Sequence, residues 1–587
     1  MSRAFYRPRG DNTIETFGGS PFFHEKSQQH MEIVQREGGL LFRRFQIAPD
    51  GKPINLVEQR VDWILGSGHH SRTYLFQTPS GEIYQLPLAW YSQISKWGMA
   101  PGYDRADHEG VARRVRHECL FCHNAYPEIA AQPGSYWRSQ SLPEELPEGI
   151  GCQRCHGPGA NHIRAVTGGK QEEIHTSIVN PAKLEPARRN DVCYECHMQP
   201  SVALSGLRRF DKDIYSFRPG APLSDYFVHL DVTEKGLPRA ERFEINHHPY
   251  RLEQSRCFRE SAARLSCLSC HDPHRKIPHA ERAEHYRNVC VACHAAQHDE
   301  AMRATADCVS CHMPQRRTQD VVHVVMTDHF IRATPGGAEL LAPLDEREPD
   351  IDDVHFLDPK LAPPAPLGDL YRSSAIVRAS GGSSVKALRR LEQMIAEARP
   401  AEIEPYLDLA MAQLKQRQIA ELEKTAELIV GRAPANAQAL EWLGVARFAL
   451  GRQAEGIALI EKALKLDPRR AETHFNLGLL LYGQGKKGAA ISHFERAVSL
   501  RPNLAAAWFH LGEARLDAKR FNDAVAAYRR ALAIDPTHTR AYAAIGRALI
   551  AAGNRDEALR YWQHGAKAAA RPETIVKLLE ENSSRHD

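Results

Sequence analysis

The chain has 587 residues, of which 42% are hydrophobic and 25% are charged, the composition of a packed globular protein. Lys and Arg number 76 against 72 Asp and Glu, and this balance excludes a dedicated nucleic-acid or anionic-membrane binder. No apolar run reaches the roughly 18 residues of a membrane-spanning helix, and the first residues lack the apolar core of a secretion signal. All 13 cysteines lie between Cys119 and Cys311, so the chain holds more than one kind of domain.

Residues 1–118 are predicted to form a small β-rich lobe that belongs to the same unit as the cysteine-rich segment after it. Turn signals rich in Gly and Pro separate short apolar segments, a pattern typical of consecutive hairpins. The clearest predicted strands are Leu41–Phe45 and Ile83–Leu88.

The sequence Cys-x-x-Cys-His occurs six times within residues 119–345, which are predicted to form a loop-rich domain. It is the attachment signal of c-type haem. Two thiols add to the two vinyl groups of one porphyrin, and the next residue places its imidazole under the iron as the proximal ligand. The predicted thioether cysteines are Cys119, Cys122, Cys152, Cys155, Cys193, Cys196, Cys267, Cys270, Cys290, Cys293, Cys308 and Cys311. The predicted proximal ligands are His123, His156, His197, His271, His294 and His312.

Zinc sites and disulfides are the alternative interpretations of these cysteines. Paired Cys-x-x-Cys elements also form tetrahedral zinc sites, and cysteine-rich segments also form disulfide frameworks. Neither alternative requires a histidine directly after the second cysteine, and all six segments have one. The pattern therefore predicts six covalently attached haem c groups.

The spacing of the motifs predicts a shared scaffold. Successive first cysteines lie 33, 41, 74, 23 and 18 residues apart, and segments this short cannot bury separate cores. The haems are expected to form the core and to lie close enough to exchange electrons, with the last three as the tightest group.

Each haem iron has a second axial position. Eighteen histidines outside the motifs precede residue 360, enough for a second histidine at every iron. Histidines placed after a motif or a turn are candidate distal ligands, although each is equally compatible with a surface or core histidine. These candidates are His70, His162, His274, His323 and His329.

Cys257 is the cysteine that remains outside the motifs. An unpaired cysteine is most often a small buried apolar residue. Its neighbours Arg256 and Arg259 would favour a thiolate, so a thiolate haem ligand or a reactive thiol is the alternative.

Residues 370–587 are predicted to form an α-solenoid after a Pro/Asp-rich linker at 346–369. Glycines recur every 34 residues, at Gly444, Gly478, Gly512 and Gly546. This is the tetratricopeptide period, in which small residues let the two helices of a repeat approach closely. Docking of a partner protein is favoured over purely structural stacking because solenoids present extended binding surfaces.

The chain resembles a bacterial family of tetratricopeptide-repeat multihaem c-type cytochromes, whose haem part is similar to the cytochrome c554 and doubled-CxxCH class. The resemblance rests on Cys152–His156 followed by Gly157–His162, Cys267–His271 followed by Asp272–His274, Gly66–His70, Val321–His329 and the repeat array. It implies distal-ligand roles for the five candidate histidines. It also implies a periplasmic or otherwise extracytoplasmic location, where haem c is attached.

Related chains carry a secretion signal and one further CxxCH motif before a segment similar to Met1–Pro8. We therefore expect that the sequence is incomplete and that the native protein has an export signal and a seventh haem. A stop codon immediately upstream of Met1 in the genome would contradict this.

The predicted fold class is mainly α: a loop-rich multihaem domain with a small β-rich N-terminal lobe, followed by an α-solenoid. The predicted function is electron relay through six haems, with a redox partner protein docked on the repeats, no nucleic-acid partner and no membrane span. The alternative is an oxidoreductase that acts on a small nitrogen or sulfur compound at one open haem. No motif replaces its proximal histidine by lysine, and no catalytic residues are predicted. In a third class, a scaffold, the haems would only stabilise the fold.

Overall fold

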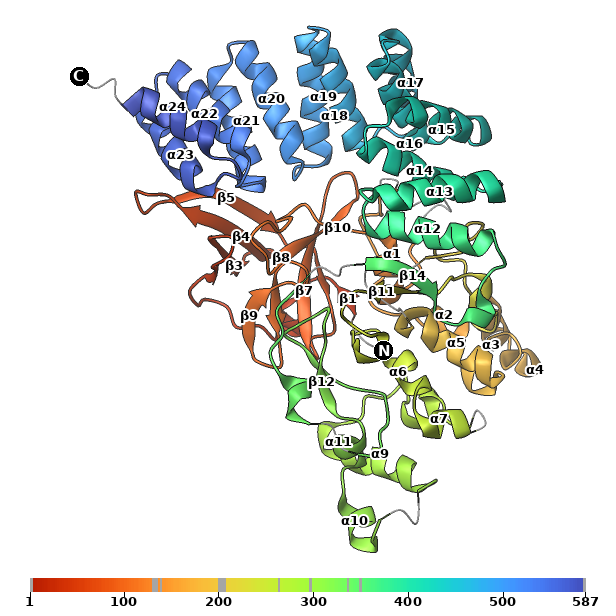
Figure 1. Cartoon of the computed structure of the whole chain (residues 1–587). Coiled ribbons are helices and arrows are strands. Elements are labelled where there is room, and N and C mark those ends of the chain that lie inside the picture. The colour runs from red at the N-terminus through yellow and green to blue at the C-terminus, as the bar shows by residue number, and fades with distance from the viewer. Residues whose placement is uncertain are drawn as a thin grey trace.

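The structure is a computed structural model that describes residues 4–128, 136–137, 140–198, 207–261, 264–294, 298–334, 337–347 and 351–583. Figure 1 shows a β-rich lobe in red and orange, a segment of short helices from yellow to green, and a row of paired helices from green to blue that arches over the lobe. The predicted β-rich N-terminal region and C-terminal helical solenoid are confirmed.

The β lobe contains two antiparallel sheets. The four-stranded sheet has the order β2-β3-β4-β5, and the six-stranded sheet has the order β1-β6-β7-β8-β10 with β9 paired to β8. The bounds are β1 Phe5–Tyr6, β2 Phe22–His24, β3 Gln29–Arg36, β4 Gly39–Ile47, β5 Pro53–Arg60, β6 Trp63–Leu65, β7 Ser71–Gln77, β8 Ile83–Tyr91, β9 Lys96–Met99 and β10 Arg114–Val115.

The two predicted strands, Leu41–Phe45 and Ile83–Leu88, lie within β4 and β8. In β4 the buried residues Leu40, Phe42 and Arg44 alternate with less buried neighbours, because successive side chains point to opposite faces of a strand. Strand β8 is buried at nearly every position, since it is central to its sheet and covered on both faces.

The segment that carries the Cys-x-x-Cys-His sequences consists of short helices joined by loops. Its helices are α1 His117–His123, α2 Gln153–His156, α3 Ala160–Thr167, α4 Gln171–Ile174, α5 Pro186–His197, α6 His248–Glu253, α7 Arg256–Glu260, α8 Cys267–Cys270, α9 Arg282–Val291, α10 Glu300–Thr305 and α11 Cys308–His312. Its strands are β11 Leu230–Glu234, β12 Gln315–Arg317 and β13 Val325–Thr327. Helices this short are not stable in isolation, so tertiary contacts must hold them.

Residues 346–369, predicted as a linker, contain a strand. Strand β14, Ile351–Phe356, pairs antiparallel with β11, and Val354 at its centre is fully buried. The strand was missed because its few apolar residues lie among Asp and Pro residues, which favour turns.

The solenoid consists of antiparallel helices. From α16 to α23 their lengths alternate between 13 and 14 residues, and the earlier pairs are less regular. The bounds are α12 Leu367–Ala379, α13 Val385–Ala398, α14 Glu404–Lys415, α15 Ile419–Arg432, α16 Ala437–Ala449, α17 Gln453–Leu466, α18 Ala471–Gly483, α19 Lys487–Leu500, α20 Ala505–Asp517, α21 Phe521–Ile534, α22 Thr539–Ala551, α23 Arg555–Ala568 and α24 Glu573–Ser583.

The repeat glycines mark where the two helices of a pair touch. A side chain on Gly546 would overlap the indole of Trp562, and one on Gly512 would overlap the ring of Tyr528. The 34-residue period therefore has a packing cause: the large residue of the second helix fills the space that glycine leaves on the first.

Gly546→Ala is expected to lower the free energy of unfolding by about 1–3 kcal/mol, because the added methyl overpacks the contact with Trp562. Gly431→Ala is the matched control: its Cβ would meet nothing within 4 Å on α15, so a gain of up to about 1 kcal/mol is expected. Chemical denaturation of both variants measures the difference. Equal shifts would rule out the helix contact as the cause.

One edge of the solenoid packs on the β lobe (Figure 1). Arg44 of β4 is buried and donates to the carbonyls of Ala533 and Ile534 at the end of α21, the latter at 3.0 Å. The last carbonyls of a helix have no partner within it, so this guanidinium caps α21. Beside it, the Asn55 amide donates to the Tyr542 hydroxyl at 2.7 Å.

Two further contacts hold the middle and the beginning of the solenoid. The backbone N–H of Ser80 donates to Leu500 O at 3.0 Å. The Trp137 indole donates to Asp408 Oδ1 at 2.6 Å, and that buried carboxylate also accepts from Arg378 at 2.8 Å. Hydrophobic clusters join the beginning of the solenoid and its helices α20 to α23 to the rest of the chain.

His564 makes this interface sensitive to acid. Its Nε2 lies 3.2 Å from Gln46 Oε1, and burial lowers the pKa of His564 to about 4. An unfolded histidine has a pKa of about 6.5, so the unfolded chain binds the proton first as the pH falls. We expect the free energy of unfolding to decrease by roughly 2 kcal/mol between about pH 6.5 and 4 from this group.

The test compares chemical denaturation of His564→Gln and the parent at about pH 7.5 and about pH 4.5. The variant is expected to lose less stability in acid than the parent. The exposed His279→Gln serves as the control and keeps the parent's acid sensitivity. Identical pH profiles for the parent and His564→Gln would contradict the assignment.

Candidate functional site

Each of the six Cys-x-x-Cys-His segments lies on or beside a short helix. The second cysteine and the histidine follow the first cysteine by three and four residues, so one helical turn places all three side chains on one face. In chain order the segments lie at α1, α2, the end of α5, α8, the end of α9 and α11. All 13 cysteines lie within the described residues, and no disulfide joins any of them.

The third segment lies between the others in space. Helix α5 contacts both α1 and α2, and Cys196 Sγ accepts a hydrogen bond from Arg154 of the second segment at 3.7 Å. The motif histidines of neighbouring segments also affect one another. Burial, and then the neighbouring His197, lowers the pKa of His123 to about 4. Burial, and then the neighbouring His271, lowers the pKa of His197. Helix α8 contacts α9, which contacts α11. The spatial order is therefore first, third, fourth, fifth and sixth, with the second beside the third.

A buried guanidinium joins the first three segments. Arg154, between the cysteines of the second segment, donates to Phe121 O at 2.8 Å in the first and lies 3.3 Å from the Glu195 carboxylate in the third. Its guanidinium lies 3.9 Å from the centroid of the Phe121 ring. Burial raises the pKa of Glu195 well above its usual range. Because the side chains of Arg154 and Glu195 are both buried, the contact fixes the relative positions of three segments.

Two histidines from different segments face each other. His156 Nε2 lies 3.5 Å from His274 Nε2, and the rings are 21° from parallel with centroids 5.7 Å apart. The Nδ1–H of His156 donates to Val179 O at 2.8 Å, so its Nε2 presents a lone pair towards His274. Metal-binding histidines are commonly oriented by a carbonyl in this way. His274 is one of the predicted distal ligands.

A second group of rings surrounds His329, another predicted distal ligand. Its ring centroid lies 6.2 Å from that of His271, with 34° between the planes, and its Nδ1–H donates to Thr327 O at 3.1 Å. His248 lies nearly perpendicular to His197 at 5.7 Å and to His329 at 4.6 Å. His248 was not singled out from the sequence.

His298 is a further histidine that sequence reasoning missed. Its ring centroid lies 6.0 Å from that of His312, and the Nδ1–H of His312 donates to Arg332 O at 2.6 Å. No motif marks His248 or His298, because their positions depend on contacts between distant segments.

The other three predicted distal ligands do not face a motif histidine among the described residues. His162 donates through Nδ1 to a backbone carbonyl at 2.8 Å. The ring of His323 meets the Tyr91 ring nearly edge-on, with 4.9 Å between the ring centroids. The ring centroids of His70 and His69 are 6.1 Å apart. Their roles as ligands remain predictions.

The fully buried carboxylate of Asp328 positions two of these rings. It accepts two hydrogen bonds from Arg251, at 2.8 Å from Nε and 2.6 Å from Nη2, and a longer one from Arg332 at 3.4 Å. Burial alone would raise the pKa of Asp328, but the hydrogen bonds from Arg251 lower it below its usual value. Arg251 lies on α6 with His248, and Asp328 directly precedes His329, so the ion pair fixes the helix against the segment that carries the second ring.

The buried rings are neutral. Burial lowers the pKa of His248 well below its usual range and that of His329 to about 4. A neutral imidazole is the form that binds a metal. Across the described ranges, no three or more His, Cys, Asp or Glu side chains form a group that could hold a bare metal ion. The arrangement found is pairs of facing or neighbouring imidazoles.

The surroundings of Cys257 do not favour a thiolate. The residue is half-buried, and burial raises the pKa of its thiol. Arg256 pairs with Glu260 at 2.7 Å. The basic flank seen in the sequence therefore does not lower this pKa.

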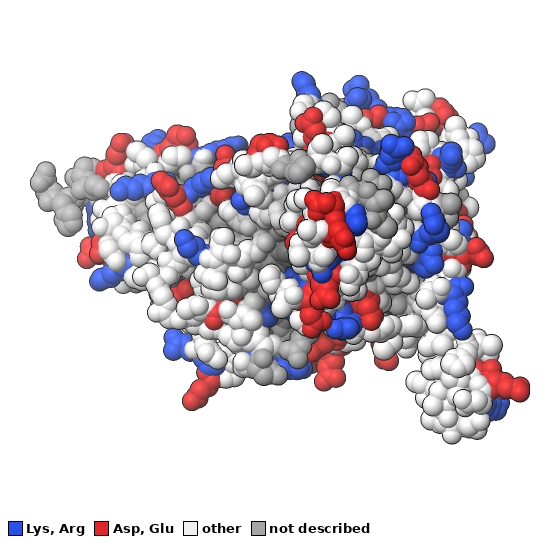
Figure 2. All heavy atoms as spheres, turned by 90° about the horizontal axis from the view of Figure 1, so that it is seen from below, with Lys and Arg blue, Asp and Glu red and all other residues white. Residues whose placement is uncertain are grey.

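The surface opposite the solenoid carries both signs of charge. Figure 2 shows Lys and Arg interspersed with Asp and Glu on this face. In the part of the chain that the structure describes, no helix is both long and apolar enough to cross a bilayer.

Three profiles of one repeat family match the C-terminal half. Two are described as "Tetratricopeptide repeat" and match residues 475–539 and 515–579, and one, "TPR repeat", matches residues 444–485. Residues 444–579 of the solenoid form a tetratricopeptide-repeat array. The prediction made from the 34-residue period is confirmed, and arrays of this kind present extended surfaces to partner proteins.

Comparison with individual proteins gives weaker matches. "Multiheme cytochrome MtrA" of Shewanella baltica (strain OS185) is 23% identical over 228 residues, which cover 36% of this chain and 65% of that protein, slightly less than two thirds. The crystal structure of MamA is 26% identical, with 28% of this chain and 91% of MamA covered and a TM-score of 0.26. YrrB, described as a TPR protein with an unusual peptide-binding site, is 18% identical over 32% of this chain and 97% of YrrB, with a TM-score of 0.27.

Proposed function

We propose that the chain is an extracytoplasmic multihaem c-type cytochrome that relays electrons through six haems and docks a redox partner on its repeats. The observation that carries the proposal is the facing pair His156 and His274, whose Nε2 atoms are 3.5 Å apart. His156 directly follows the cysteines of the second segment, and His274 lies three residues after the histidine of the fourth. The match to a multihaem cytochrome supports it.

The residues present fit haem c. Bonds between a metal and an imidazole nitrogen are about 2 Å long, so two histidines that held one iron between them would have nitrogens about 4 Å apart. The separation of His156 and His274 is close to this value. The porphyrin provides four iron ligands itself, so two histidines complete a site. When bound, haem c supplies a one-electron carrier.

The ring contacts single out four pairs of histidines that would each hold one haem iron. They are His156 with His274, His271 with His329, His197 with His248, and His312 with His298. His70, His162 and His323 are the candidates for the remaining two sites, at His123 and His294.

The chain itself performs three tasks in this proposal. Its paired cysteines hold each cofactor on a helical turn. Burial keeps the imidazoles of His248 and His329 neutral and therefore able to bind iron. The contacts from α1 and α2 to α5, and from α8 through α9 to α11, keep successive sites adjacent, which is the arrangement that electron relay requires.

The second candidate function is an oxidoreductase with one open iron site. It requires a proximal histidine without a histidine opposite. Among the residues described, neither His123 nor His294 has a second imidazole against its ring, so the first and fifth segments are where such a site is proposed.

One preparation tests both candidates. The chain is produced behind a secretion signal in a bacterium that attaches haem c, and the pyridine haemochrome spectrum is measured per mole of protein. Six haems per chain and only low-spin ferric signals in electron paramagnetic resonance are expected for the relay. A high-spin signal that shifts with nitrite, hydroxylamine or sulfite would favour the oxidoreductase. A colourless protein, or pigment that extracts into acidified acetone, would contradict both.

A further inference from the structure

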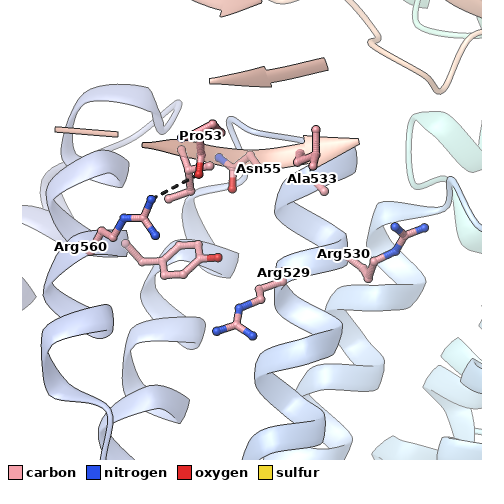
Figure 3. Close-up of a pocket in the computed structure, with 9 residues that line it drawn as sticks. Pro53, Asn55, Arg529, Arg530, Ala533 and Arg560 are labelled. Atoms are coloured by element: carbon pink, nitrogen blue, oxygen red, sulfur yellow. Dashed lines mark hydrogen bonds between the residues drawn. The ribbon is translucent and has the colours of Figure 1, made fainter. Parts of the chain in front are cut away.

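A pocket of about 250 Å³ lies where the solenoid meets the β lobe (Figure 3). It is bounded by edge strand β5 on one side and by α21 and α23 on the other. Its lining contains three arginines and no acidic residue, unlike the mixed charges of the surface opposite the solenoid. The lining residues are Pro53, Ile54, Asn55, Leu56, Arg529, Arg530, Ala533, Arg560 and Tyr561.

Asn55 presents an unused acceptor to this pocket. Strand β5 has a bulge here, where the pairing register with β4 shifts between Arg44 and Gln46, and the φ of Asn55 is 56°. Bulges redirect side chains and are common beside functional sites. The Asn55 Nδ2 donates to Gln46 Oε1 at 3.1 Å and to the Tyr542 hydroxyl at 2.7 Å, which fixes the orientation of the amide. Its Oδ1 is buried and has no hydrogen-bond partner among the described residues.

The three arginines leave one positive charge without an acidic partner. Arg560 lies 3.0 Å from Asp50 and donates to a backbone carbonyl at the pocket wall. Arg529 lies 2.5 Å from Glu557. Arg530 is exposed, stacks its guanidinium 5.7 Å from the centroid of the Trp508 ring, and pairs with no carboxylate in the described part of the chain.

A ligand that carries negative charge and also donates a hydrogen bond would complement both Arg530 and Asn55 Oδ1. A fully ionised inorganic anion only accepts hydrogen bonds, so it would leave Asn55 Oδ1 unsatisfied. A peptide segment with Asp or Glu side chains offers both groups: a carboxylate for Arg530 and a backbone N–H for Asn55. The exposed Leu56 adds an apolar contact at the mouth of the pocket.

We propose that this pocket binds an acidic segment of a partner protein. The inference deepens the proposed docking role of the repeats, and it rests on the proposed function only for the redox nature of that partner. It places the binding site at the seam between the lobe and the array.

The test measures the fluorescence anisotropy of a labelled Gly-Asp-Glu-Asp-Gly peptide with the full chain at low and at about 150 mM salt. Saturable, salt-sensitive binding is expected for this peptide and not for its Gly-Asn-Gln-Asn-Gly counterpart. Arg530→Gln is expected to weaken binding about tenfold, since it removes a hydrogen bond to a charged group. Arg496→Gln, an exposed arginine on α19 outside the pocket, is the matched control and should bind as the parent does.

Equal affinity of the acidic and amide peptides, or an unchanged affinity for Arg530→Gln with an unchanged melting temperature, would overturn the proposal. Binding of inorganic phosphate at the pocket without peptide binding would also overturn it, in favour of a small-anion site. Peptide binding by a protein without haem would leave this inference standing and contradict the cytochrome. A protein that contains haem but does not bind the peptide would contradict this inference and leave the cytochrome proposal standing.

Discussion

Replacing both Cys193 and Cys196 by alanine is expected to lower the haem content of the purified protein from six to five per chain. Both thioether bonds of the third segment are lost, and a histidine alone holds haem only by coordination. The pyridine haemochrome absorbance per mole of protein and the intact mass measure the loss. Retention of six covalent haems would contradict the assignment of these cysteines.

The same variant tests the spatial order of the segments. Helix α5 contacts both α1 and α2, so loss of the third site should slow electron exchange between the first two sites and the rest, leaving the contact of His156 with His274 as the remaining connection. We expect reduction by a mixed reductant to become biphasic in stopped-flow absorbance. The matched control replaces Cys308 and Cys311, at the far end of the order. It also loses one haem, but reduction of its remaining sites should not become biphasic. Identical kinetics in the two variants would contradict the central position of the third segment.

Asp328→Asn is expected to lower the free energy of unfolding by about 3–5 kcal/mol, the usual effect of breaking a buried ion pair from one side. The substitution leaves the buried Arg251 without its carboxylate. It should also change the low-spin signals of the sites that hold His248 and His329, because the ion pair sets the positions of those rings. Chemical denaturation and electron paramagnetic resonance measure the two effects.

The control for this variant is Asp211→Asn. Asp211 is exposed and pairs with Lys212 at 2.7 Å, so its loss should change stability by no more than about 0.5 kcal/mol. If the denaturation curve and the electron paramagnetic resonance spectrum of Asp328→Asn match those of the control, Asp328 does not position the two rings.

Local patterns in the sequence were sufficient for the repeat array and for the strands of the lobe. The spacing of the repeat glycines reflects contacts within single helix pairs, such as Gly546 against Trp562, and these are close in sequence. Alternation in β4 likewise reports one buried face. Features that arise within about 35 residues of chain can be read without a structure.

Features that depend on distant contacts could not be predicted. His248 and His298 carry no motif, and their positions near other rings come from folding of the whole segment. The strand β14 forms because β11, more than 100 residues earlier, offers an edge to pair with. The docking of Arg44 on the end of α21 joins residues almost 500 positions apart, beyond any local pattern.

The seam between array and lobe has a mechanical consequence. Because Arg44, Ser80 and Trp137 anchor the array at its far end, its middle and its start, it cannot swing as a tethered arm would. A protein that docked on the array would therefore face the cysteine-rich segment in one orientation and at one distance. No flexible tether has to be ordered at each encounter, so the loss of conformational entropy occurs once, during folding, and does not oppose binding.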